Sequence, residues 1–292
     1  MRDFDFLQPT SVAEASRMLA DLGDECRVIA GGTALMLVMR QRMLNPSHLI
    51  SVQKIAALQG ISWDGQSGLR IGALSRHTDV AQSDLVGQHH PMLARMAAQV
   101  ANPQVRNQGT LGGNLCYGDP STDPPGALMA LGAEVILASA RGERVLNMEA
   151  FLLDYFTTAI EPDELVVAVR IPPAAPHTQA RYTRFKRTAA EHRPLASVSV
   201  ALQIQKGICT QVRLVVGASV AVPRRIEQAE QFLEGRSLDA STIEQAADLV
   251  AQGIEPISDL RGSADYRREM VRISASRTLE SLSPAYPAKD RS

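Results

Sequence analysis

The sequence predicts an α+β protein made of a two-lobed N-terminal α/β domain and a C-terminal domain with an antiparallel sheet and helices. The 292 residues exceed the usual size of one domain. A segment rich in Pro and Ala, at 172–176, interrupts the periodic pattern. Beyond it, the predicted strands all precede the predicted helices, an order typical of an antiparallel sheet covered on one side. The predicted domains are 1–175, with lobes of about 1–53 and 54–175, and 176–283, followed by a tail at 284–292.

The first lobe alternates helices and strands. Ser11-Val12-Ala13-Glu14 fits a capping box, and apolar residues recur at helical spacing from there to Leu22. Short apolar runs predict strands at 26–29 and 48–52, with a helix at 34–40 between them. These segments predict a small α/β unit that ends near Gln53.

The second lobe begins with a hairpin around Asp64-Gly65. Its predicted strands are 61–63, 69–71, 134–138, 145–146 and 164–171, and its predicted helices are 78–83, 90–100 and 127–131. His89-His90 resembles a metal-binding pair, but adjacent helical residues point about 100° apart and no third ligand lies nearby. We therefore expect both histidines at the solvated surface. In the C-terminal domain we expect strands at 181–187, 197–205 and 208–217 and helices at 225–233, 242–252 and 264–282.

Composition excludes several classes of function. The formal charge is −1 and the charged residues are 21% of the chain, so no field attracts nucleic acid. No apolar run is long enough to cross a bilayer, and Met1-Arg2-Asp3-Phe4-Asp5 lacks the basic-then-apolar order of a signal peptide. We expect a cytoplasmic protein. The three cysteines form no Cys-x-x-Cys pair, and an iron–sulfur cluster normally needs four thiolates, so we expect none on this chain.

The most informative stretch is 101–126, which is rich in Gly and Pro. Between Val105 and Leu128 this composition disfavours an interior helix or a central strand and predicts a long shaped loop. Gly109, Gly112 and Gly113 can turn their N–H groups into a concave nest for an anion such as phosphate. A tight structural turn is the alternative.

A second glycine turn lies near the N-terminus. Ala30-Gly31-Gly32-Thr33 follows a predicted strand and precedes a predicted helix, which places free N–H groups and the positive end of a helix dipole together. The pattern is neither G-x-G-x-x-G nor G-x-x-x-x-G-K-[ST], so it predicts neither a Rossmann site nor a Walker loop. Two separate phosphate nests suit a diphosphate, so we expect the two turns to converge on one ligand.

These residues resemble a known family. Ala30-Gly31-Gly32-Thr33, Thr110-Leu111-Gly112-Gly113-Asn114 and Thr122-Asp123-Pro124 are similar to the paired FAD-pyrophosphate motifs of the flavin-binding medium subunit of molybdenum hydroxylases. The resemblance extends over nearly the whole chain, from Phe4-Asp5-Phe6-Leu7-Gln8-Pro9 to Leu279. It implies a PCMH-like FAD-binding fold. Ala34 departs from the family, which usually has Asp, Asn or Ser there.

The resemblance also implies the residues of an FAD site: Ala30, Gly31, Gly32, Thr33, Ala34, Leu35, Thr110, Gly112, Gly113, Asn114, Thr122, Asp123 and Lys186. Lys186, in the first predicted strand of the C-terminal domain, corresponds to a family lysine that approaches the flavin ring; its alternative is a solvent-facing charge. Asp123 is also placed to cap the predicted helix that follows it. Arg106 either balances diphosphate charge or anchors the loop to carbonyl groups.

The implied function is that of an FAD-binding electron-transfer subunit. The implied partners are a large molybdopterin subunit and a small iron–sulfur subunit, in a dimer of heterotrimers, that is, a heterohexamer. The molybdenum cofactor and the iron–sulfur clusters would belong to those partners. Two other functions remain open: a self-contained FAD-dependent oxidase or dehydrogenase of the same architecture, and a scaffold whose glycine turns bind no cofactor.

Overall fold

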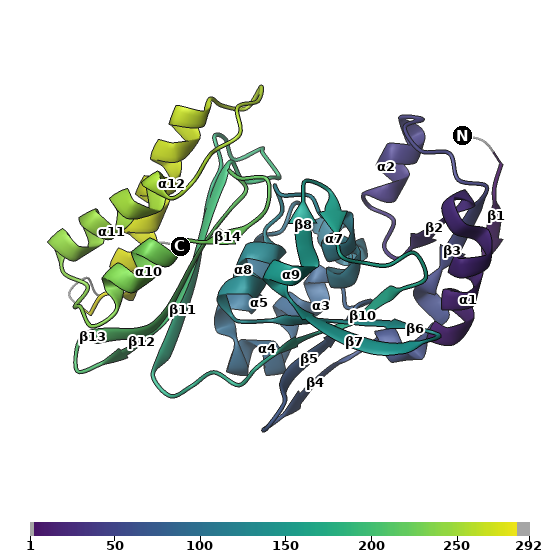
Figure 1. The fold of residues 1–292 in the computed structure, drawn as a ribbon, viewed down its shortest axis with the longest axis horizontal. Coiled ribbons are helices and arrows are strands. Elements are labelled where there is room, and N and C mark those ends of the chain that lie inside the picture. The colour runs from purple at the N-terminus through teal and green to yellow at the C-terminus, as the bar shows by residue number, and fades with distance from the viewer. Residues whose placement is uncertain (1–2, 285–292) are drawn as a thin grey trace.

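The computed structural model describes residues 3–284 (Figure 1). The first lobe is a parallel sheet in the order β1-β3-β2. Its elements are β1 (Asp5–Leu7), α1 (Val12–Leu22), β2 (Cys26–Ile29), α2 (Leu35–Arg40) and β3 (His48–Ser51), followed by single 3-10 turns. The hydroxyl of Ser11 accepts a hydrogen bond from the N–H of Glu14, which confirms the predicted start of the first helix. Strand β1 was not predicted.

The second lobe is a five-stranded antiparallel sheet in the order β4-β5-β10-β6-β7. Its strands are β4 (Ile61–Asp64), β5 (Gly68–Gly72), β6 (Glu134–Ser139), β7 (Gly142–Asn147) and β10 (Leu165–Ile171), and β8 (Leu152–Asp154) pairs with β9 (Thr157–Thr158) in a small hairpin. Its helices are α3 (His77–Gln82), α4 (Asp84–His89), α5 (Pro91–Gln99), α6 (Pro103–Gln108), α7 (Leu111–Tyr117), α8 (Pro124–Ala130) and α9 (Met148–Phe151). None of the helices within residues 3–284 is long and apolar enough to cross a membrane.

The prediction of a long loop between Val105 and Leu128 is wrong, because three short helices occupy this stretch. Local side chains cap the first two of these helices. Asn102 accepts a hydrogen bond from Val105 N–H at the start of α6, and Thr110 accepts one from Gly113 N–H at the start of α7. Gly118, with φ of +63°, ends α7 in the left-handed conformation. Capping at both ends outweighs the low helix propensity of Gly.

The predicted surface position of His89-His90 is wrong for His90, which is only 3% exposed. Burial, followed by the charge of His89, lowers the pKa of His90 to about 4. The ring of His89 stacks on Trp63, with ring centroids 3.5 Å apart. Both histidines therefore serve packing against β4.

The C-terminal domain is an antiparallel sheet in the order β11-β12-β13-β14. Its elements are β11 (Thr178–Phe185), β12 (Ala196–Gln205), β13 (Ile208–Gly217), β14 (Arg224–Arg225), α10 (Glu227–Leu233), α11 (Ala240–Gln252) and α12 (Ala264–Leu282). The three helices cover the outer face of this sheet, as the sequence predicts, whereas α8 and α5 of the second lobe lie on its other face (Figure 1).

Helix α8 therefore lies between two sheets, and all seven of its residues are buried. Tyr182 of β11 and Val215 of β13 belong to the same apolar core as the second lobe. The predicted covering of the C-terminal sheet on one side only is thus incomplete. A continuous apolar core between two parts of a chain holds them in one arrangement, so the loops that border this core are held in fixed positions relative to each other.

Candidate cofactor site

The two glycine turns lie against each other. A Cβ added to Gly31 would lie 2.1 Å from the carbonyl oxygen of Gln108 and 3.0 Å from Cα of Gly109. A Cβ added to Gly109 would lie 3.3 Å from Oγ1 of Thr33. The first distance is too short for any side chain at position 31, so the contact requires glycine there, and the second leaves little room for a side chain at position 109. The expectation that the two turns converge is confirmed.

The first turn has five consecutive unpaired donors. The backbone N–H groups of residues 31–35 donate no hydrogen bond to any residue in the described range 3–284. Ala34 stands at the N-cap of α2, where its methyl group caps nothing. Gly32 has φ of +71°, a conformation that glycine adopts without strain. Since buried or partly buried donors in proteins are nearly always paired, this turn fits an acceptor-rich ligand such as a diphosphate.

The second turn differs, and the predicted nest of free N–H groups at Gly109, Gly112 and Gly113 is wrong. Gly109 N–H donates to the carbonyl of Val105 (2.6 Å), and Gly112 N–H donates to the carbonyl of Ala73 (2.9 Å). Gly113 N–H donates to Oγ1 of Thr110 (3.1 Å). All three glycine donors are therefore used inside the protein, and this turn resembles the structural alternative more closely.

The exposed face of α7 carries polar groups beside the first turn. Gly113 is exposed, and a Cβ added to it would lie 3.8 Å from Cβ of Ala30. Asn114 Oδ1 accepts a hydrogen bond from Oγ1 of Thr122 at 3.1 Å. The structure thus places Gly113 next to Ala30 and joins Asn114 to Thr122, while the assignment of these residues to a cofactor stays a prediction.

Asp123 does not cap α8, so the alternative that the sequence left open is wrong. Its carboxylate is 3% exposed and turns toward the C-terminal domain. Tyr182 Oη donates to Oδ1 of Asp123 (2.5 Å), and Nη1 of Arg184 lies 3.1 Å from the same oxygen. Burial raises the pKa of Asp123 to about 6, although Arg184 acts in the opposite direction. Sequence analysis missed both partners, since 59 positions separate Tyr182 from Asp123.

Lys186 follows the end of β11 at Phe185, so its predicted place inside the strand is wrong by one residue. Its Nζ donates to the carbonyl of Ala189 at 3.2 Å. The charge of Lys186 acts to lower the pKa of Asp123, against the larger effect of burial. Lys186 lies two residues after Arg184, whose Nη1 is 3.1 Å from Oδ1 of Asp123.

Arg106 anchors its own loop, because Nη1 donates to the carbonyl of Val100 at 2.9 Å. The structure thus favours the anchoring alternative for this residue. Beside it lies His77, which is 2% exposed and which no sequence pattern singled out. Its backbone N–H donates to the carbonyl of Gly109 (3.1 Å), and its ring atom Cδ2 would lie 3.4 Å from a Cβ added to Gly109. Burial, then the charge of Arg106, lowers the pKa of the imidazole to about 4. His77 therefore contacts the second turn through its backbone and packs its buried ring beside Gly109.

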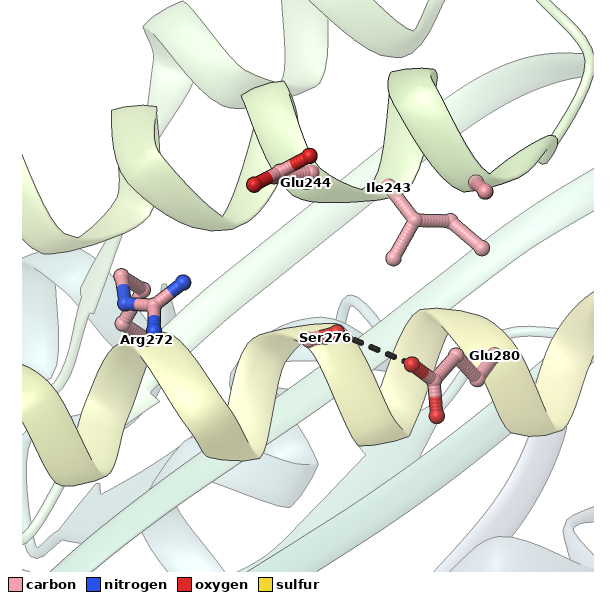
Figure 2. Close-up of a pocket in the computed structure, with 6 residues that line it drawn as sticks. Ile243, Glu244, Arg272, Ser276 and Glu280 are labelled. Carbon is pink, nitrogen blue, oxygen red and sulfur yellow. Dashed lines mark hydrogen bonds between the residues drawn. The ribbon is translucent and has the colours of Figure 1, made fainter.

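Two cavities lie away from the first turn. One of about 220 Å³ lies between α11 and α12 on the outer helices of the C-terminal domain (Figure 2). The other, of about 300 Å³, is lined by residues of α3, α5 and α6 and includes Arg106 and Asn107. Apart from Arg106, for which a diphosphate role was one alternative, neither cavity is lined by a residue that the sequence assigned to the cofactor site.

Comparison with known proteins agrees with the geometry. Residues 2–174 match the family described as FAD binding domain in molybdopterin dehydrogenase, and residues 180–282 match the family described as CO dehydrogenase flavoprotein C-terminal domain. The 6-hydroxypseudooxynicotine dehydrogenase complex subunit alpha of Paenarthrobacter nicotinovorans is 35% identical over 98% of this chain and 97% of its own length. The carbon monoxide dehydrogenase medium chain of Hydrogenophaga pseudoflava is 32% identical over 94% of this chain and 96% of its own length.

Solved structures give the same result. A chain of carbon monoxide dehydrogenase from Hydrogenophaga pseudoflava has a TM-score of 0.92 and 33% identity, covering 96% of this chain and 97% of that chain. A chain of quinoline 2-oxidoreductase from Pseudomonas putida 86 has a TM-score of 0.91 and 30% identity, covering 98% and 99%. The predictions of FAD as cofactor and of an oxidoreductase subunit are confirmed.

Proposed function

We propose that this chain, which belongs to the family of FAD-binding flavoprotein subunits of molybdenum hydroxylases, passes electrons from iron–sulfur clusters on a partner subunit to an external acceptor. The observation that carries the proposal is the first glycine turn, which has five N–H donors unpaired within residues 3–284 and packs against Gln108 and Gly109, just before the second motif. FAD, when bound, supplies the redox chemistry, since its flavin can take up and release electrons singly or in pairs.

We assign residues 30–35 to the diphosphate of FAD, with the donors of residues 31–35 as its hydrogen-bonding partners. We place Thr110, Gly112, Gly113, Asn114 and Thr122 in the adjoining wall, in which Gly112 and Thr110 shape α7 while Gly113 is exposed. Both contacts to Asp123 use Oδ1, and we assign its other oxygen, Oδ2, to a cofactor hydroxyl. Ala34 offers only its backbone N–H.

Lys186 is the residue that we assign to the flavin ring. A fixed ammonium group stabilises negative charge that develops nearby, more strongly where water is excluded. Its electrostatic effect on Asp123 supports a position on the side of the second motif. In this role Lys186 tunes the ring and transfers no proton.

The partners follow from the relatives. Their names identify them as subunits or chains of larger enzymes, which favours a subunit over a self-contained oxidase. We propose a large molybdopterin subunit and a small iron–sulfur subunit as partners, in a cytoplasmic dimer of heterotrimers. The substrate would then be hydroxylated on the large subunit, so its identity lies outside this chain.

The variant Gly32→Asp tests the proposal, because a carboxylate at the first turn repels a diphosphate and adds a side chain at positive φ. The matched control is Gly207→Asp, which has φ of +80° and open space around it in the β12–β13 hairpin. We expect the purified Gly32→Asp chain to retain no FAD and to unfold close to the control, whereas the control retains flavin. Normal flavin content in Gly32→Asp would remove the first turn from the site.

A further inference from the structure

The segment Asp119–Asp123, here called the docking segment, leads from α7 to α8 and is held almost entirely by the C-terminal domain. Its contacts are an ion pair of Asp119 Oδ2 with Arg193 Nη2 (2.9 Å), a hydrogen bond from Ala218 N–H to the carbonyl of Pro120 (3.1 Å), one from Arg261 Nη2 to Ser121 Oγ (2.9 Å), and those of Tyr182 and Arg184 to Asp123. The Thr122 hydroxyl instead donates to Asn114 of α7 and to the carbonyl of Asp119 inside the segment. The docking segment therefore joins the second glycine motif to the C-terminal domain.

The same arginines hold a loop of the C-terminal domain. Residues 186–194, here called the lysine loop, begin with Lys186, and residues 187–190 are exposed. Arg184 Nη2 donates to the carbonyl of His192 at 2.8 Å, while its Nη1 faces Asp123 and donates to the carbonyl of Gln99. Arg193, inside the loop, pairs with Asp119. The lysine loop is thus tied at its far end to the docking segment.

We propose that Arg184 and Arg193 are positioning residues that hold the lysine loop, and with it Lys186, at the cofactor site by fixing the loop to the docking segment. This inference rests on the proposed placement of Lys186 beside the flavin. It adds that the placement depends on two residues outside both glycine motifs and on one short segment of the N-terminal domain.

Burial makes the ion pairs of Asp119 and Arg184 costly to break. The Asp119 carboxylate is 2% exposed and the Arg184 side chain is 6% exposed. A buried charge that loses its partner strongly destabilises the folded state. When one partner is removed, the docking segment or the lysine loop must therefore move so that water can reach the remaining charge. Arg193 itself is 56% exposed, and its replacement leaves no cavity. The Arg187–Glu191 ion pair lies within the loop and ties it to nothing else in the described part of the chain.

The experiment compares Arg193→Gln with Arg187→Gln in the full-length chain loaded with FAD. Both variants remove one positive charge from the same loop, but only the first breaks a contact with the docking segment. We expect Arg193→Gln to accelerate hydrogen–deuterium exchange of residues 186–194 by about tenfold. We also expect it to shift the flavin reduction potential, measured by spectroelectrochemical titration, in the same direction as Lys186→Met. Arg187→Gln should change the exchange rate and the reduction potential less than Arg193→Gln does. Arg193→Lys should bring both values part of the way back to those of wild type.

The outcomes separate two failures. If Lys186→Met leaves the potential unchanged, the lysine is not beside the flavin, and both its assignment and this inference are overturned. If Lys186→Met shifts the potential but Arg193→Gln acts no differently from Arg187→Gln, the positioning role alone is wrong. As a second probe inside the fold, Tyr182→Phe removes one hydrogen bond from Asp123 and should produce a smaller shift of the same sign; a shift of opposite sign contradicts the inference.

Discussion

The two glycine turns look alike in sequence and differ in how they use their backbone donors. In the first turn, residues 31–35 leave five N–H groups unpaired among the described residues. In the second, Gly112 N–H donates to Ala73 and Leu111 N–H donates to Ser75, both at 2.9 Å. A glycine motif can therefore satisfy either of two requirements, room for a ligand or room for a neighbouring backbone. Here the first turn leaves room for a ligand, the second leaves room for the backbone at Ala73 and Ser75, and the two turns contact each other.

The largest effect that we expect on the second turn comes from Gly112→Val, which should lower the free energy of unfolding. A Cβ at this position would lie 2.6 Å from Cβ and 2.9 Å from Cα of Ala73, so the variant forces α7 away from the residues that follow β5. Overpacking of this kind destabilises by about 3 kcal/mol. We expect urea unfolding of the FAD-free chain to show this loss.

Gly87→Val is the matched control, because Gly87 is also helical, in α4, but has no atom within 4 Å of an added Cβ. We expect a change of about 1 kcal/mol or less in the free energy of unfolding. If Gly112→Val instead lost FAD while its unfolding matched the control, the second turn would be a binding turn like the first.

The two turns also differ in the titratable groups beside them. The backbone N–H of His77 donates to the carbonyl of Gly109 in the second turn, whereas residues 31–35 contain no titratable side chain. Burial lowers the pKa of His77 from 6.5 to about 4. The unfolded chain then binds a proton at this histidine more readily than the folded chain. Above about pH 6.5 the group does not reduce the free energy of unfolding, and this free energy decreases as the pH falls from about 6.5 toward about 4. Between about pH 7.5 and about pH 5 the loss from this group amounts to about 2 kcal/mol.

The measurement is the free energy of unfolding of wild type and His77→Gln as a function of pH. Between about pH 7.5 and about pH 5 the free energy of unfolding of His77→Gln should fall by about 2 kcal/mol less than that of wild type. His90→Gln is the control for location, since burial gives His90 the same direction of shift at a different place. Only His77→Gln should alter exchange of the α7 amides; equal effects of both variants on α7 would separate His77 from the second turn.

The sequence allowed the convergence of the turns and the cofactor to be predicted, because both depend on motifs in which the residue types are specific. It did not reveal which turn keeps its donors free. That choice depends on Ala73 and Ser75, nearly 40 positions before Gly112, which no local pattern connects to the turn. The helices α6 and α7 were missed for a related reason: propensity disfavours Gly and Pro, while the caps Asn102 and Thr110 and tertiary packing decide the outcome.

The long-range contacts of Asp123 were missed in the same way. Its sequence position suits a helix cap, yet its carboxylate turns to Tyr182 and Arg184 on a strand of the other domain. By contrast, the start of α1 and the strands of the C-terminal sheet follow from capping and apolar periodicity, which are local. Local patterns thus predicted elements, and contacts between distant segments decided the roles of individual polar groups.

The smallest effect that we expect comes from Thr110→Ala, which removes the hydroxyl that caps α7. Loss of such a cap destabilises by about 1 kcal/mol, and Thr110→Ser should retain most of the stability because Ser is an equally good cap. If the hydroxyl serves the helix, the dissociation constant of FAD, measured by titration of the FAD-free chain, should rise by less than about tenfold in Thr110→Ala. A larger rise with unchanged stability would mean that Thr110 serves the cofactor directly, and the two turns would then differ less than their backbone hydrogen bonds indicate.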